Sequence, residues 1–218
     1  MADHSEYFAQ VAQSVVECKK EVCLRLLEEG RDIDPLEILE QGLGKGIRQI
    51  GDEFGRGVIF LPELIGAADV MKAGVAVLDE RVKASGKART SQGKIVIGTV
   101  KGDIHDIGKS VVASMLQANG YDVVDLGIDV DVAAFVKAAV EHQADCVAMS
   151  SLLTFNIDYM GVVVQKLKDE GLRDRVKIIV GGAPVTQEFA DEIGADAFGW
   201  DASDAVRKMG TLIARGAM

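Results

Sequence analysis

The sequence predicts an α/β protein in two parts: an N-terminal helical bundle over residues 1–88 and a doubly wound parallel sheet over residues 92–218. Apolar residues of the first part recur with helical periodicity and show almost no β-branched alternation. In the second part, short apolar runs alternate with amphipathic runs. Residues 85–93 are small, polar and aperiodic, as is typical of a linker between two domains.

The first part predicts three helical segments. The first continues to Gly30, and Asp34-Pro35 then starts a second, with the aspartate as N-cap and the proline at the first helical position. The glycine-rich run at 51–57 breaks or frays this helix. A third segment begins at Leu61 and continues to about Val82. These segments predict a small helical bundle.

Glycine is unusually frequent within these predicted helices. Each glycine in a helix interior costs about 1 kcal/mol relative to alanine. Close approach of neighbouring helices would compensate for this cost. The residues concerned are Gly42, Gly44, Gly46, Gly66 and Gly74.

The second part alternates strand-like and helical runs. The predicted strands are residues 95–100, 123–126, 147–150, 178–180 and 197–199, and the predicted helices are residues 107–119, 132–141, 158–170, 187–193 and a last one from Asp201. Such alternation predicts right-handed βαβ units and a flavodoxin-like sheet. In sheets of this kind, ligands bind in the loops beyond the carboxyl ends of the strands.

Composition argues against nucleic-acid and membrane partners. The formal net charge is -10, and no cluster of lysine and arginine offsets it. No apolar run approaches the ~20 residues needed to span a bilayer, and no basic segment leads into an apolar one at the N-terminus. Cys18, Cys23 and Cys146 lack metal-ligand spacing and are expected to be free thiols in a reducing compartment. We therefore expect a cytoplasmic protein.

The loop from Gly102 to Ser110 follows the first predicted strand and is expected to hold a metal-binding histidine. In an extended segment, Asp103 and His105 point the same way. An imidazole that binds a metal through one ring nitrogen needs an acceptor to fix its other N–H, and a nearby carboxylate provides one. Gly108 would leave room for a bulky group against the backbone.

Simpler interpretations of this loop remain open on the residues alone. Asp106 could cap the following helix, Asp103 could be a turn residue and His105 an exposed loop histidine. A phosphate-binding loop is excluded by spacing, because it requires glycine five positions before Gly108, where Asp103 stands.

The same loop resembles the D-x-H-x-x-G signature of corrinoid-binding domains, in which the histidine is the lower axial ligand of cobalt. Nearly the whole chain is similar to the cobalamin-binding module of methionine synthase. In length and arrangement it resembles still more the stand-alone corrinoid proteins of methanol, methylamine, betaine and aryl-ether methyltransferase systems. The resemblance implies cobalamin or a related corrinoid as cofactor, with His105 as the metal ligand and Gly102, Ile104, Asp106 and Gly108 beside it.

The ends of two further strands match the family's pocket for the nucleotide tail of the corrinoid. Serine and glycine there would by themselves be ordinary turn formers. Together they would form a groove in which hydroxyl groups meet the polar parts of the tail and glycine lets the tail lie against the protein backbone. The implied positions are Ser150, Leu152, Thr154, Gly181 and Gly182, with Ala202 at the ring edge. Pro184 departs from the pattern, because it removes a backbone donor from this groove.

A second departure concerns the relay behind the histidine. The methionine synthase pattern has a serine where this chain has Asn156, and that serine completes a relay from His105 through Asp103. An amide can still donate to the carboxylate, so the resemblance implies that His105, Asp103 and Asn156 act together.

In the family, a helical cap shields the reactive face of cobalt. The aligned apolar positions are Phe54 and Leu61, with Leu64 and Ile65 behind them, and the cap glutamate falls on Glu40. On periodicity alone, Phe54 and Leu61 could equally belong to the core of the bundle. A lid has a clear chemical use, because cobalt(I) is a strong nucleophile that water and oxidants would consume.

We therefore expect a corrinoid methyl carrier. Its cobalt(I) would accept a methyl group from a substrate-specific methyltransferase and pass it to a second methyltransferase, with a thiol or tetrahydrofolate as final acceptor. A reductive activation protein is a further candidate partner. Alternatives are the corrinoid subunit of a radical mutase, a cobalamin-based sensor, and a metal-free phosphate or receiver domain on the same fold. The sequence names neither the methyl donor nor the oligomeric state.

Overall fold

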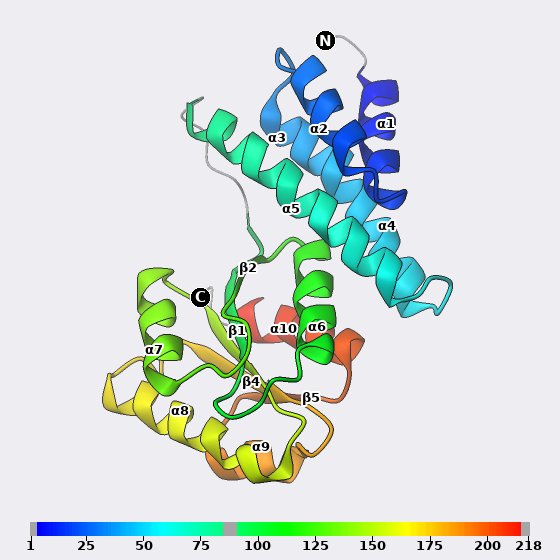
Figure 1. Ribbon diagram of the computed structural model, residues 1–218. Coiled ribbons are helices and arrows are strands. Elements are labelled where there is room, and N and C mark those ends of the chain that lie inside the picture. The colour runs from blue at the N-terminus through cyan, green and yellow to red at the C-terminus, as the bar shows by residue number, and fades with distance from the viewer. Residues whose placement is uncertain (1–3, 85–90, 215–218) are drawn as a thin grey trace. The chain divides into compact units, whose positions relative to one another are not determined.

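The computed structural model describes residues 4–84 and 91–214, and the chain divides into two compact units, residues 1–90 and 91–218 (Figure 1). Most of the predicted linker, residues 85–90, lies outside the described residues. That residues 1–88 and 92–218 fold as separate domains stays a prediction. None of the helices within the described ranges is long and apolar enough to cross a membrane.

The N-terminal unit is helical throughout. Its elements are α1 (Ser5–Val16), α2 (Lys20–Glu29), α3 (Pro35–Glu37), the π-helical segment η1 (Ile38–Leu43), α4 (Gly44–Gly55) and α5 (Leu61–Ala84). Asp34 caps α3 as predicted, since its Oδ1 accepts from the Leu36 N–H at 3.0 Å and Pro35 is the first helical residue.

The predicted single helix up to Gly30 is wrong, because the chain breaks between α1 and α2. Cys18 has a φ of +56°, and the N–H groups of Cys18 and Lys19 donate back to Val15 and Ser14. This left-handed residue ends α1. Side-chain periodicity did not reveal the break, because the apolar pattern continues on both sides of it.

The core of this unit explains the glycines in its helices. A Cβ on Gly46 would lie 2.5 Å from the carbonyl oxygen of Ala12 in α1, and a Cβ on Gly74 would lie 2.7 Å from the Leu43 side chain. The helices therefore approach each other more closely than an alanine would permit. Large side chains fill the remaining interior, including the fully buried Leu27, Ile38, Leu43, Ile47, Ile50, Leu64 and Leu78.

The C-terminal unit is a parallel sheet with helices on both faces. Its elements are β1 (Lys94–Thr99), α6 (Ile107–Ala118), β2 (Asp122–Asp125), α7 (Val132–Glu141), β3 (Cys146–Ser150), η2 (Thr154–Asn156), α8 (Asp158–Asp169), β4 (Lys177–Gly181), α9 (Gln187–Ile193), β5 (Ala197–Gly199) and α10 (Ala202–Ala214). The strand order is β2-β1-β3-β4-β5, and every pair is parallel. The predicted doubly wound fold is confirmed.

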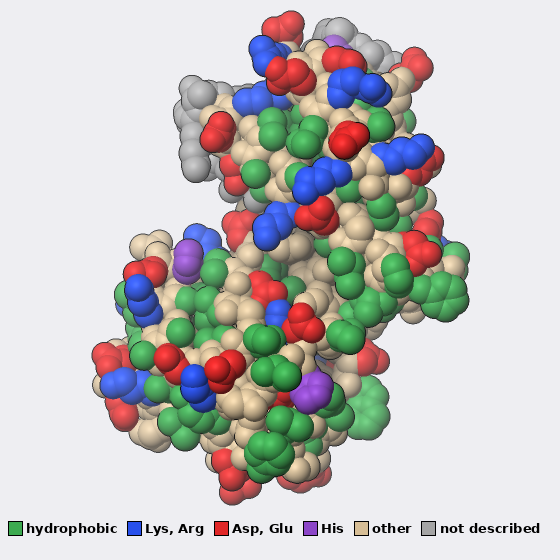
Figure 2. All heavy atoms as spheres, in the orientation of Figure 1, with side chains coloured by type: hydrophobic (Ala, Val, Ile, Leu, Met, Phe, Trp, Pro, Cys, Tyr) green, Lys and Arg blue, Asp and Glu red, His purple; other side chains and the backbone are tan. Residues whose placement is uncertain are grey.

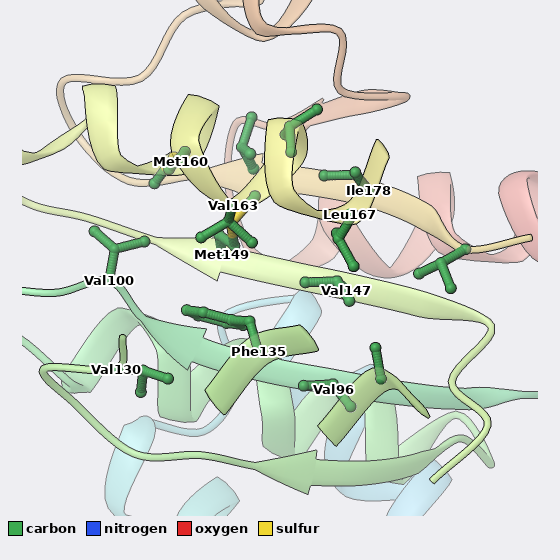
Figure 3. Packing of buried hydrophobic residues seen from close by; sticks show 14 of the residues in the cluster. Val96, Val100, Val130, Phe135, Val147, Met149, Met160, Val163, Leu167 and Ile178 are labelled. Carbon is green, nitrogen blue, oxygen red and sulfur yellow. The ribbon is translucent and has the colours of Figure 1, made fainter. Parts of the chain in front are cut away.

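Two apolar clusters hold the sheet between its helices. Helices α7, α8 and α9 supply one cluster, in which Phe135, Met160 and Leu167 are fully buried against Val96 and Val147 (Figure 3). Helices α6 and α10 cover the other face with side chains such as Leu116 and Met209. Burial on both faces explains why the central strands are continuous apolar runs.

From β1 the chain moves toward one edge of the sheet to form β2, and it then returns past β1 to form β3, β4 and β5 toward the other edge, so the switch point of the sheet lies between the parallel strands β1 and β3. Thr99 pairs with Ser150 at the last position of the register, and the Val100 N–H donates to the Ser150 carbonyl at 3.1 Å. The loops that follow these two strands therefore begin side by side, at the edge where doubly wound sheets bind ligands.

Candidate functional site

His105 lies in the loop between β1 and α6, and a buried carboxylate holds it. Its Nδ1 is 2.7 Å from Asp103 Oδ1, and its backbone N–H donates to the same oxygen at 2.9 Å. Thr99 Oγ1 donates to the His105 carbonyl at 3.1 Å. The Asp103 side chain is 0% exposed, whereas the imidazole is 48% exposed. The loop therefore fixes one side of the ring and leaves the other accessible.

Asp103 is an ionised acceptor. Burial alone would raise the pKa of its carboxyl, but hydrogen bonds outweigh that effect and hold the pKa well below its usual range. Besides the two contacts from His105, Oδ2 accepts from Ser151 Oγ at 2.8 Å and from the Leu152 N–H at 2.6 Å. A carboxylate can only accept, so His105 Nδ1 carries a hydrogen, and in the neutral ring Nε2 presents its lone pair.

The hydroxyl behind Asp103 comes from Ser151, and the expectation that Asn156 fills this role is wrong. Among the described residues, Asn156 Nδ2 is a buried side-chain nitrogen without a hydrogen-bond partner. It lies against Gly102, where an added Cβ would be 2.8 Å away. Asn156 belongs to the short helix η2, whereas Ser151 directly follows β3 and so faces the loop after β1. That position next to the strand end was the signal that could have identified Ser151.

The surface beside the imidazole is apolar. Ile104, Ile107 and Leu152 are 69%, 67% and 47% exposed, although buried positions are usual for such side chains. A Cβ on Gly108 would meet nothing within 4 Å, so the backbone there is open as predicted. On the face drawn in Figure 2, acidic and basic side chains are interspersed with hydrophobic ones.

Lys109 takes no part in an anion site. Its side chain is 3% exposed, and its Nζ lies 2.5 Å from Asp125 Oδ2 at the end of β2. This half-buried ion pair engages the lysine that superficially resembles a phosphate-loop lysine. Asp106 precedes α6 but forms no side-chain cap, so capping does not account for it.

The predicted tail positions lie at the ends of the neighbouring strands. Ser150 pairs with Gly181 at the last register position of β3 and β4. Gly182 has a φ of +125°, and a Cβ there would be 1.8 Å from the Ser151 carbonyl oxygen, so only glycine fits. Thr154 is exposed at the start of η2, and Ala202 begins α10 beyond β5. Ala202 is thus separated from His105 by two strands of the sheet.

Comparison with known proteins assigns the family. A model of the B12 binding domain matches residues 93–207, and a second model of the same description matches residues 7–79. Dimethylamine corrinoid protein 2 of Methanosarcina mazei is 45% identical over 214 residues, which are 98% of this chain and 100% of that protein. The chain belongs to the corrinoid-protein family. It binds cobalamin or a related corrinoid.

Other proteins are similar to this corrinoid protein over nearly its whole length. Trimethylamine corrinoid protein 2 of Methanosarcina mazei is 42% identical over 96% of this chain and 97% of that protein. The crystal structure of the methanol:cobalamin methyltransferase complex MtaBC from Methanosarcina barkeri matches with a TM-score of 0.87 and 28% identity, covering 96% of this chain and 80% of the matched chain. Monomethylamine corrinoid protein of Methanosarcina barkeri matches with a TM-score of 0.54 and 31% identity, over 96% and 99% of the two chains.

The residues at the β1 and β3 ends fit a corrinoid. A large, flat and mainly apolar ring suits the exposed side chains of Ile104, Ile107 and Leu152 and the open backbone at Gly108. The imidazole beside them would offer a nitrogen ligand to the cobalt of such a ring.

The expected cap residues belong to the N-terminal unit. Phe54 near the end of α4 and Leu61 at the start of α5 are half-buried, Ile65 is 44% exposed, and Glu40 is exposed in η1. Leu64, by contrast, is fully buried. Leu64 is therefore part of the core of this unit, whereas Phe54 and Leu61 keep accessible surface.

We predict that Ser151→Ala destabilises the apo-protein and that Asn156→Ala leaves its stability nearly unchanged. A hydrogen bond to a buried charge contributes about 1–3 kcal/mol, and Ser151 supplies one whereas Asn156 does not. Urea denaturation gives the free energy of unfolding of each variant. The same measurement in an Asp103→Ala background gives the coupling energy between Asp103 and each of the two residues. A larger coupling of Asp103 to Asn156 than to Ser151 would contradict the assignment.

Proposed function

We propose that this corrinoid protein is the methyl carrier of a methylamine methyltransferase system, with His105 as the protein ligand of its cobalt. The observation that supports this most is the 2.7 Å contact between His105 Nδ1 and the buried Asp103 carboxylate, which reserves Nε2 for the metal. When bound, the corrinoid supplies the cobalt centre that receives and releases a methyl group.

The residues around His105 have separate parts in this proposal. Asp103 fixes the tautomer and raises the basicity of the imidazole, and Ser151 and the Leu152 N–H keep Asp103 charged by donating to its second oxygen. Ile104, Ile107 and Leu152 provide the apolar floor. Gly108 lets the backbone approach the ring closely, whereas Gly102, with its positive φ, shapes the turn that delivers Asp103.

The positions at the other strand ends would accommodate the nucleotide tail. Ser150 and Thr154 provide hydroxyl groups, and Gly181 and Gly182 leave the end of β4 without side chains. Ala202 would touch the edge of the ring. Asn156 is proposed to fill the space beside Gly102 and to take no part in a proton relay.

Partners follow from the names of the relatives. These are dimethylamine and trimethylamine corrinoid proteins, and a solved neighbour is the methanol:cobalamin methyltransferase complex MtaBC. The donor partner is a methyltransferase specific for a methylated amine. The acceptor partner is a second methyltransferase that passes the methyl group to a thiol or to tetrahydrofolate, and a reductive activation protein restores oxidised cofactor.

The donor is tested directly by methylation of the reduced holoprotein. We expect a dimethylamine or trimethylamine methyltransferase, together with its amine, to methylate the protein faster than a methanol methyltransferase with methanol. The absorption spectrum of the holoprotein follows the reaction, and protein lacking corrinoid is the control. Methylation by the methanol enzyme alone would contradict the proposed donor, and methylation by none of these enzymes would contradict the carrier role.

The cap is proposed to shield the cobalt through Phe54, Leu61 and Glu40. We predict that Phe54→Ala or Leu61→Ala leaves corrinoid bound but accelerates photolysis of the methylated holoprotein, because an apolar lid is lost. Leu64→Ala is the matched control. That residue is fully buried, so its truncation should cost about 2–5 kcal/mol of stability without a comparable effect on photolysis. Unchanged photolysis in a stable Phe54→Ala protein would place Phe54 away from the cobalt.

A further inference from the structure

The segment that delivers Asp103 is a tight turn. The Asp103 N–H donates to the Val100 carbonyl at 3.1 Å, and Gly102, the third residue of the turn, has a φ of +83°. Glycine with positive φ at this position is the signature of a type II turn. The hydrogen bond that closes the turn leaves the N–H of Gly102 unused, so that group needs an acceptor from elsewhere.

Asp129, in the loop after β2, supplies that acceptor and makes two more contacts to the same turn. Its Oδ1 accepts from the Gly102 N–H at 2.8 Å, and its Oδ2 lies 3.3 Å from Lys101 Nζ. Its own N–H donates to the Asp103 carbonyl at 3.0 Å. The side chain and the backbone N–H of Asp129 thus contact three consecutive residues of the turn, Lys101 to Asp103.

The conformation of Asp129 is itself unusual. It has a φ of +53°, a left-handed conformation that few residues other than glycine, asparagine and aspartate adopt. The next residue, Val130, is held in place because its N–H donates to the Thr99 carbonyl at 3.0 Å. The loop after β2 is therefore hydrogen-bonded to β1 at the residue next to Asp129. An unfavourable backbone conformation such as that of Asp129 persists only where the surrounding structure imposes it.

We propose that Asp129 is a positioning residue that fixes the turn so that Asp103 holds His105 in its Nδ1–H form. Its hydrogen bonds go to the turn and not to His105, so it acts through Gly102 and Asp103. The part of this proposal that concerns corrinoid rests on the proposed function. Contacts of 2.6–2.8 Å from Asp103 to Leu152, His105 and Ser151 leave little room for the carboxylate to shift.

Two substitutions separate the carboxylate from the backbone conformation. Glycine and asparagine both tolerate positive φ, so Asp129→Gly and Asp129→Asn both preserve the left-handed backbone conformation of residue 129. Asparagine keeps an oxygen for the Gly102 N–H, whereas glycine keeps none. Asp131→Ala is the matched control, because Asp131 lies in the same loop but its Oδ1 caps α7 through the Ala134 N–H at 2.8 Å.

The readout is the ring-nitrogen NMR spectrum of the full chain without corrinoid, labelled with ¹⁵N-histidine and recorded at about pH 8.5, above the usual histidine range. A His105→Gly spectrum assigns the resonances. We expect the wild type, Asp129→Asn and Asp131→Ala to show a protonated Nδ1 and an unprotonated Nε2. In Asp129→Gly the two shifts should move toward each other as the tautomers mix. Wild-type shifts in a folded Asp129→Gly protein, or mixed shifts in Asp129→Asn, would overturn the proposal.

Binding of aquocobalamin to the same variants keeps this test separate from the proposed function. We expect the dissociation constant to rise about 3- to 10-fold in Asp129→Gly, less than the 10- to 100-fold typical of a group in direct contact with a metal-binding histidine. If Asp129→Gly showed mixed tautomers of His105 but bound aquocobalamin with unchanged affinity, Asp129 would still be a positioning residue. The same result would count against His105 as a ligand of the cobalt. Unchanged tautomers would overturn the role of Asp129 whatever the affinity.

Discussion

The site depends on one buried carboxylate. Burial of Asp103 would normally favour its neutral form, and the charge survives because N–H and O–H donors from both sides of the sheet's switch point converge on its two oxygens. Once charged, the carboxylate determines which nitrogen of His105 carries hydrogen. The tautomer, and with it the capacity to bind a metal through Nε2, is thus a consequence of how two loops meet.

The fold brings those loops together through contacts between residues that are far apart in the sequence. Ser151 lies 48 positions after Asp103, and the parallel pairing of β1 with β3 places the two at one edge. Asp129 joins them from the loop after β2. The loops after three consecutive strands in the sheet order therefore contribute to the surroundings of one histidine, at the edge where doubly wound sheets bind ligands.

Much of the fold and part of the site could be predicted from sequence, because the signals are local. Strand and helix periodicities identified every element of the sheet, and the spacing of Asp103 and His105 placed both on one side of an extended loop. The break at Cys18 was missed because a left-handed backbone leaves no trace in the apolar pattern. Ser151 was missed in favour of Asn156 because the donor is selected by strand register, which an aligned motif does not encode.

The most direct test of His105 as the cobalt ligand is electron paramagnetic resonance of the cobalt(II) holoprotein, prepared with and without ¹⁵N-histidine. An axial ¹⁴N ligand splits each cobalt line into three, and ¹⁵N splits it into two. If His105 is the ligand, labelling converts triplets into doublets, His105→Gly removes the splitting, and His142→Gly retains it. Triplets that persist after labelling would assign the axial nitrogen to the cofactor's own base and would contradict the central role of His105.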